Sequence, residues 1–233
     1  MAEKGVSRKE ATVEVCVFLF LIVPSMAFSF LVIGSEEGQL SFTFLAVSTI
    51  LRDLALVSLI FFFLWRNGEP VTAVGWRYRD LDTNILLGFV LYIPFVFVIS
   101  VVAQLLTAAG LSPPSEPAPS FFRFHGGWDL ALAVILVVVV AISEETIFRG
   151  YLTLRLRTAT TSTTAAVLLA SAVFALGHGY EGSLGVVTVG VMGVLLNLVY
   201  LWRKSLLAPI VLHFLQDFIA IVLVQYLPKQ VAA

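Results

Sequence analysis

Long apolar stretches separated by short polar segments occupy most of this chain. A transmembrane helix needs about 20 predominantly apolar residues to cross the hydrocarbon core of a bilayer. Seven stretches approach or exceed that length: 15–33, 41–64, 85–109, 128–148, 163–178, 184–201 and 206–226. The pattern predicts an all-α protein, a polytopic bundle of about seven or eight transmembrane helices, with the eighth arising if one long stretch is broken.

The composition indicates the same class. The chain is 59% hydrophobic and 12% charged, with a mean hydropathy of +0.99, outside the range of soluble globular domains. The first apolar stretch is longer than the roughly 7–15 residue apolar core of a cleaved signal peptide, so we expect it to be retained. No repeat of fixed period is present, and the Pro-rich stretch 112–119 is expected to be a loop between spans. We therefore expect one integral-membrane domain over 1–233.

Charge placement predicts an orientation and excludes one class of partner. A net charge of −1 without a basic run provides no footprint for nucleic acid. Lys and Arg concentrate in alternate loops, as expected of positively charged cytoplasmic loops, so the N-terminus is expected to be cytoplasmic. The residues that set this pattern are Lys4, Arg8, Lys9, Arg66, Arg77, Arg79, Arg155, Arg157, Arg203 and Lys204, with Lys229 on the opposite side. The lack of an Arg/Ser-rich, transit-like head favours a plasma (inner) membrane or an ER-type setting, with the protein in contact with lipid. The single Cys16 excludes an intramolecular disulfide framework.

Ionisable residues inside the apolar stretches are the candidates for chemistry. Each costs at least about 2.5–3.5 kcal/mol at bilayer depth, so a functional role is the default hypothesis. The candidates are Arg52, Asp53, Glu144, Glu145, Arg149, His178, His213 and Asp217.

The stretch "EETIFR" over 144–149 places three of them together. Glu145 and Arg149 are spaced i,i+4 on a helix and are expected to form an ion pair, whereas Glu144 points about 100° away. Glu144 is thus left without a cation, which suits a carboxyl group that takes up and releases a proton. The alternative is that the span ends here and all three charges lie among the lipid headgroups. The positions of Arg155 and Arg157 indicate that the helix continues beyond these charges before it reaches water. Glu144 would then lie about 17 Å from the cytoplasmic end of the helix.

The two histidines in apolar stretches carry different expectations. His178 has Phe174 one helical turn earlier and, as a lone histidine at the end of a span, is on its own more typical of an interface. His213 has Asp217 at i,i+4, so the pair could ligate a metal, fix the tautomer of the histidine or clamp two helices. Water-activating sites are commonly made from two His and one carboxylate, with or without metal.

Other polar residues are expected to be structural. Arg52 and Asp53 are sequence neighbours, so we expect each to find a partner on another helix. Asn197 and Gln104 are expected to form interhelical hydrogen bonds. A zincin helix, a Gly-x-Ser-x-Gly elbow and a Cys–His pair are all absent from the sequence.

Three motifs, in order, resemble those of one family. "EETIFR" (144–149), "FALGH" (174–178) and "HFLQD" (213–217) resemble the Glu-Glu-x-x-x-Arg, Phe-x-x-x-His and His-x-x-x-Asn/Asp motifs of the CPBP intramembrane protease family, which includes type II CAAX prenyl endopeptidases and bacteriocin-immunity relatives. The motif-bearing core spans about 128–226. The first half of the chain resembles the family only in being apolar helices.

The resemblance implies roles for individual residues. Glu144 would activate water with the help of His178, and His213 with Asp217 would stabilise the oxyanion or bind metal, for which zinc is the expected ion. Asp217 takes the place of an Asn that could donate a hydrogen bond, and an ionised Asp cannot donate one. This substitution favours an orienting or cation-binding role for Asp217. Glu145, Arg149 and Phe174 would support the site.

The sequence therefore predicts an intramembrane endopeptidase that hydrolyses a peptide bond of a membrane-anchored peptide or protein through a glutamate-activated water. Metal dependence stays open, and so does the substrate, which could be a prenylated C-terminal tail, a peptide pheromone, a bacteriocin or a sorting-signal protein. The alternative class is a non-catalytic membrane protein, either a binding or immunity factor or a small ion-coupled transporter. The absence of duplicated halves and the ordered motifs favour the protease.

Overall fold

The computed structural model describes residues 5–31, 41–111 and 126–226, and all regular elements within these ranges are helical. The α-helices are α1 (Arg8–Leu31), α2 (Phe42–Asn67), α3 (Leu81–Ala108), α4 (Gly127–Glu144), α5 (Thr153–Thr160), α6 (Thr163–Leu176), α7 (Gly182–Arg203) and α8 (Leu207–Asp217). The π-helices are η3 (Glu145–Leu152) and η5 (Phe218–Leu223), and the 3₁₀ turns are η1 (Val71–Val74), η4 (Gly179–Glu181) and η6 (Val224–Tyr226). The expected all-α fold is confirmed. The Pro-rich stretch 112–119, Lys4 and Lys229 lie outside the described residues.

Six helical runs in the described residues are long and apolar enough to cross a membrane. Five of them correspond to α1, α2, α3, α7 with η4, and α8 with η5 and η6, and the sixth joins α4, η3 and α5 into Gly127–Thr160. The stretch predicted as the fifth span is the shorter helix α6, with 14 residues. At 1.5 Å per residue α6 is about 21 Å long, which is less than the roughly 30 Å of the hydrocarbon core.

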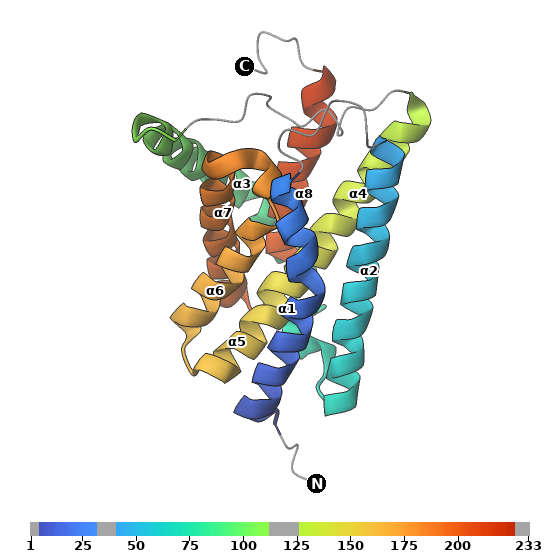
Figure 1. The fold of residues 1–233 in the computed structure, drawn as a ribbon, viewed down its shortest axis with the longest axis vertical. Helices are drawn as coiled ribbons and strands as arrows, with labels where there is room; N and C mark the ends of the chain where they lie inside the picture. Colours follow the sequence, from blue (N-terminus) through green and yellow to red (C-terminus); the bar gives the residue numbers. More distant parts are fainter. Residues whose placement is uncertain (1–4, 32–40, 112–125, 227–233) are drawn as a thin grey trace.

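The helices pack as neighbours that are mostly distant in sequence (Figure 1). The helix α2 runs beside α4 in the same direction, α3 lies against α8, and α6 pairs with its successor α7. The helix α1 lies against α5 and passes in front of the bundle in this view. This packing brings α4, η3, α6 and α8, which carry the three motifs, into one interior.

A buried polar cluster joins α1 to the far end of the α4–η3–α5 run. Arg155 Nε donates to Glu14 Oε2 at 2.6 Å, the Tyr151 hydroxyl donates to the same oxygen at 2.8 Å, and the Arg155 guanidinium also pairs with Glu69. The expectation that Arg155 marks a cytoplasmic loop is wrong, because this arginine is buried in α5. A buried Arg is tolerated because two carboxylates neutralise it and take its hydrogen bonds.

Candidate active site

The first motif lies where an α-helix widens into a π-helix. Glu144 is the last residue of α4, and η3 begins at Glu145 and continues without interruption into α5. The helix therefore continues past the charges, as predicted, rather than ending among the headgroups. The π-turn shifts backbone hydrogen bonds, and the Thr153 hydroxyl donates to the Phe148 carbonyl oxygen at 2.8 Å. Single π-turns within α-helices are frequently found at functional sites.

Glu145 and Arg149 form the predicted i,i+4 ion pair, with Oε1 and Nη1 2.9 Å apart and both side chains fully buried. The contact has ion-pair distance but not hydrogen-bond geometry, and within the described part of the chain the guanidinium nitrogens have no other hydrogen-bond partner. The guanidinium carbon lies 4.2 Å from the centre of the Phe174 ring. A cation held against an aromatic face in this way gains electrostatic stabilisation that offsets part of its burial cost.

Both nitrogens of His213 face carboxylate oxygens. Nδ1 lies 2.8 Å from Glu145 Oε1, while Nε2 lies 3.4 Å from Asp217 Oδ2 and 3.7 Å from Glu144 Oε2. The predicted i,i+4 pairing of His213 with Asp217 is confirmed. Carboxylates accept hydrogen bonds and do not donate them, so each ring nitrogen is placed to donate. The His213 side chain is 3% exposed and that of Glu144 is 14% exposed, so the glutamate is the more accessible member of the pair.

Glu145 makes the shortest contact of His213, and the sequence did not predict this contact. The i,i+4 spacing indicated only Asp217 as a partner that orients this histidine. The Glu145–His213 contact joins residues 68 positions apart, and no helical spacing signals such a pair. The only signal was that an adjacent glutamate pair offers two carboxylates on different faces of one helix.

His178 lies two residues beyond the end of α6, at the entrance to η4. Its Nδ1 is 3.1 Å from the Phe174 carbonyl oxygen, so Nδ1 carries the proton and Nε2 is left as an acceptor. The Phe174 ring contacts both histidines, with centroid distances of 4.9 Å to His178 and 5.9 Å to His213. Phe174 therefore connects His178 to the group formed by Glu144, Glu145 and His213.

The expectation for Arg52 and Asp53 is wrong. Arg52 Nε donates to Asp53 Oδ1 at 2.9 Å, so these neighbours pair with each other. The side-chain directions of adjacent helical residues diverge, but the long and flexible arginine side chain folds back far enough to reach its neighbour. Asp53 is buried on α2, the helix that packs against α4.

One of the two expected interhelical amides is confirmed. Oδ1 of Asn197, on α7, lies 2.8 Å from the Thr153 hydroxyl oxygen. Nδ2 of the same side chain donates to the Ser171 hydroxyl of α6 at 3.3 Å. Gln104 instead lies exposed on α3 and makes no interhelical hydrogen bond with the residues that the structure describes. Asn197 thus ties α7 to the segment that follows the first motif.

The side chains as they stand do not form a metal-binding set. Among the described residues, no three His, Cys, Asp or Glu side chains are grouped around one point. Nδ1 of His213 is engaged by Glu145 and Nδ1 of His178 by a backbone carbonyl, so each histidine has only Nε2 to offer. The predicted metal site of Glu144, His178, His213 and Asp217 stays a prediction.

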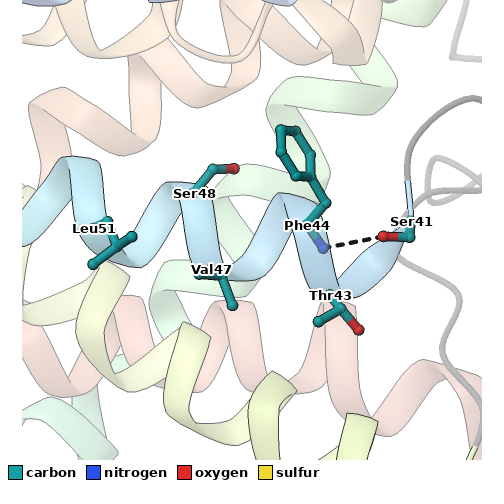
Figure 2. Close-up of a pocket in the computed structure, with 6 residues that line it drawn as sticks. All are labelled: Ser41, Thr43, Phe44, Val47, Ser48 and Leu51. Atoms are coloured by element: carbon teal, nitrogen blue, oxygen red, sulfur yellow. Dashed lines mark hydrogen bonds between the residues drawn. The ribbon is translucent and has the colours of Figure 1, made fainter.

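A surface hollow on α2 lies apart from this chemistry. Ser41, Thr43, Phe44, Val47, Ser48 and Leu51 line it (Figure 2). Its lining is largely apolar, the Ser41 hydroxyl accepts from the backbone N–H of Phe44 to cap α2, and Ser48 donates to its own helix. Without a titratable group, a surface of this kind suits contact with lipid rather than catalysis.

Comparison with known proteins finds a match to the motif-bearing part of the chain. Residues 126–219 match the family model described as type II CAAX prenyl endopeptidase Rce1-like. Glu144, Phe174, His178, His213 and Asp217 all fall within this range, so the resemblance carried by the three motifs is confirmed for this part of the chain. No curated protein and no solved structure matches the chain. The match, with six candidate spans, supports an integral membrane protein and, in general terms, an intramembrane endopeptidase.

Proposed function

We propose that the protein hydrolyses a peptide bond of a membrane-anchored peptide or protein, using a water molecule that Glu144 activates. The observation that carries the proposal is the position of Glu144, a partly accessible carboxylate 3.7 Å from a buried histidine whose other nitrogen is held by Glu145. A base and a hydrogen-bond donor thus lie side by side where a reacting carbonyl group would need both. The family match supports peptide hydrolysis as the reaction class.

The proposed reaction begins with proton transfer from water to the Glu144 carboxylate. The water oxygen forms a bond to the scissile carbonyl carbon as the proton leaves, which produces a tetrahedral intermediate with a negative oxygen. Glu144 then returns the proton to the amide nitrogen as the carbon–nitrogen bond breaks. The products are a carboxylic acid and an amine, and Glu144 is regenerated.

His213 is the proposed donor to the negative oxygen. Glu145 accepts from Nδ1 and fixes the ring plane, which leaves Nε2 directed toward Glu144 and Asp217. The distances of 3.4 and 3.7 Å leave Nε2 loosely held, so it can turn its hydrogen bond toward a substrate oxygen. Asp217, an acceptor, supports the protonated ring and does not itself donate. The acceptor Nε2 of His178 is proposed to share the attacking water.

The first test uses a farnesylated peptide with a C-terminal CAAX sequence, and the same peptide without the lipid, incubated with the full chain in liposomes. We expect wild type to cleave the lipidated peptide, and Glu144→Gln to lower kcat by at least about 100-fold, because the amide cannot accept a proton at the relevant step. Cleavage is measured by mass spectrometry, and thermal unfolding shows that the variant is folded. Glu14→Gln, which changes a buried carboxylate outside the site, is the matched control.

Undiminished cleavage by Glu144→Gln would refute the glutamate mechanism. Failure of wild type to cleave either peptide would shift support to the binding or transport alternative. The same preparations, analysed for metal by elemental mass spectrometry, decide the cofactor: stoichiometric zinc lost in His213→Ala would establish a metal mechanism, while an active protein without metal supports the mechanism proposed above.

A further inference from the structure

A charged pair on α2 lies level with the proposed base. Helices α2 and α4 run side by side in the same direction (Figure 1). Ala46 of α2 and Val137 of α4 belong to the same apolar cluster. Asp53 and Glu144 each follow seven residues later, about 10 Å farther along their helices. The two carboxyl groups therefore reach a similar depth.

The Asp53 carboxyl group has one satisfied and one unsatisfied oxygen. Oδ1 accepts from Arg52 Nε at 2.9 Å, whereas Oδ2 is buried and has no hydrogen-bond partner in the ranges that the structure describes. The side chain is only 2% exposed, and it interacts electrostatically with Glu144 and His213. Asp53 is thus a second carboxylate that approaches the site, from a helix outside the three motifs.

A purely structural role does not account for this pair. Its ion pair joins two neighbours on one helix, so it does not hold two helices together. A charged group at bilayer depth carries a cost of several kcal/mol, and polar groups in spans face a water-filled cavity or the bundle interior. The Arg52 side chain is 45% exposed, whereas that of Asp53 is 2% exposed.

Unsatisfied carboxylate oxygens are present on both of these helical runs. Asp53 Oδ2, Glu144 Oε2 and Glu145 Oε2 are all buried without a hydrogen-bond partner among the described residues. A buried acceptor left without a donor is costly, and water molecules commonly satisfy such groups when several polar atoms line one space. Hydrolysis inside a bilayer also requires water to be held beside the base.

We propose that Asp53, held by Arg52, is a positioning residue that binds the water activated by Glu144. The proposal rests on the proposed function, because Glu144 is the group that performs the chemistry. Oδ2 would accept one hydrogen of the water while Glu144 removes the other. Arg52 fixes the carboxyl orientation through Oδ1, and its charge offsets the repulsion between two neighbouring carboxylates.

The test compares Asp53→Leu with Asp53→Asn in the liposome assay described above. Leucine has similar volume but cannot bind water, and its expected effect is a loss of about 100-fold in kcat with KM nearly unchanged, because only the attacking water is misplaced. Asparagine retains a carbonyl oxygen that accepts a hydrogen bond, so its loss should be smaller. Thermal stability should not fall for Asp53→Leu, since Arg52 is left half-exposed rather than buried.

Glu14→Gln serves as the control for loss of a buried carboxylate outside the site, with lower thermal stability but wild-type kcat expected. Wild-type kcat in Asp53→Leu, or unfolding of both Asp53 variants, would assign the pair a structural role and overturn the proposal. Full activity of Glu144→Gln would instead remove the proposed function. An experimental structure at high resolution gives an independent readout: we expect a water on Asp53 Oδ2 in wild type that is lost in Asp53→Leu.

Discussion

Residue by residue, the site depends on how one buried arginine is neutralised. Arg149 and Glu145 are each fully buried, and Glu145 also holds His213 Nδ1 at 2.8 Å. Glu145 therefore neutralises the cation and orients the histidine at once. Removing one partner from a buried ion pair leaves an uncompensated charge, whereas replacing both by apolar side chains of similar volume is often neutral.

We predict that Arg149→Met destabilises the protein by about 3–5 kcal/mol, because the Glu145 charge remains buried without its partner. The double variant Glu145→Leu/Arg149→Met should recover much of that stability, yet stay poorly active because His213 loses the acceptor that fixes its ring. Thermal unfolding in detergent and the peptide assay measure the two quantities separately. Equal activity of the double variant and wild type would show that Glu145 has no orienting role.

Among the individual elements, the two π-helices stand out because each begins directly after a proposed site residue. The element η3 starts after Glu144, and η5 starts after Asp217. A π-turn inserts one extra residue per turn and so changes the direction in which the following side chains point. In η3, close packing holds this turn: a Cβ on Gly150 would lie 2.7 Å from the Val74 backbone oxygen of η1.

We predict that Gly150→Ala destabilises the fold by about 1–3 kcal/mol, because η1 must move away from η3 to admit the methyl group. Gly190→Ala in α7 is the matched control, since its added Cβ meets only the Ala175 methyl at an ordinary 3.5 Å. That variant should be neutral or slightly stabilising, as alanine loses less backbone freedom than glycine within a helix. Thermal unfolding measures the stability of both variants, and equal stability of the two would contradict the prediction.

For the whole molecule, six candidate spans and the shorter helix α6 put the motif residues inside a helical bundle. The direction of this bundle in the membrane follows from the distribution of Lys and Arg, which predicts a cytoplasmic N-terminus. Ser7 immediately precedes α1, and Gly127 is the first residue of α4. Under this prediction, these two residues lie on opposite sides of the membrane.

We predict that a membrane-impermeant maleimide labels Gly127→Cys in intact cells and labels Ser7→Cys only after the membrane is opened. Both substitutions are made in a Cys16→Ser background, because Cys16 is the only cysteine in the chain. A Cβ on Gly127 meets open space, so the substitution should be tolerated. The reverse labelling pattern would overturn the predicted orientation.

The sequence by itself determined the class of fold and most of the local pairs. Apolar length predicts membrane helices, and the i,i+4 spacing predicted the Glu145–Arg149 and His213–Asp217 contacts, because helical geometry alone brings such residues together. Only the tertiary structure decided that Glu145 holds His213 and that Arg155 is buried against Glu14. Those relations depend on which helices pack together and at what rotation. The apolar surfaces that drive this packing are nearly uniform in composition, so no pattern along the chain specifies the partner.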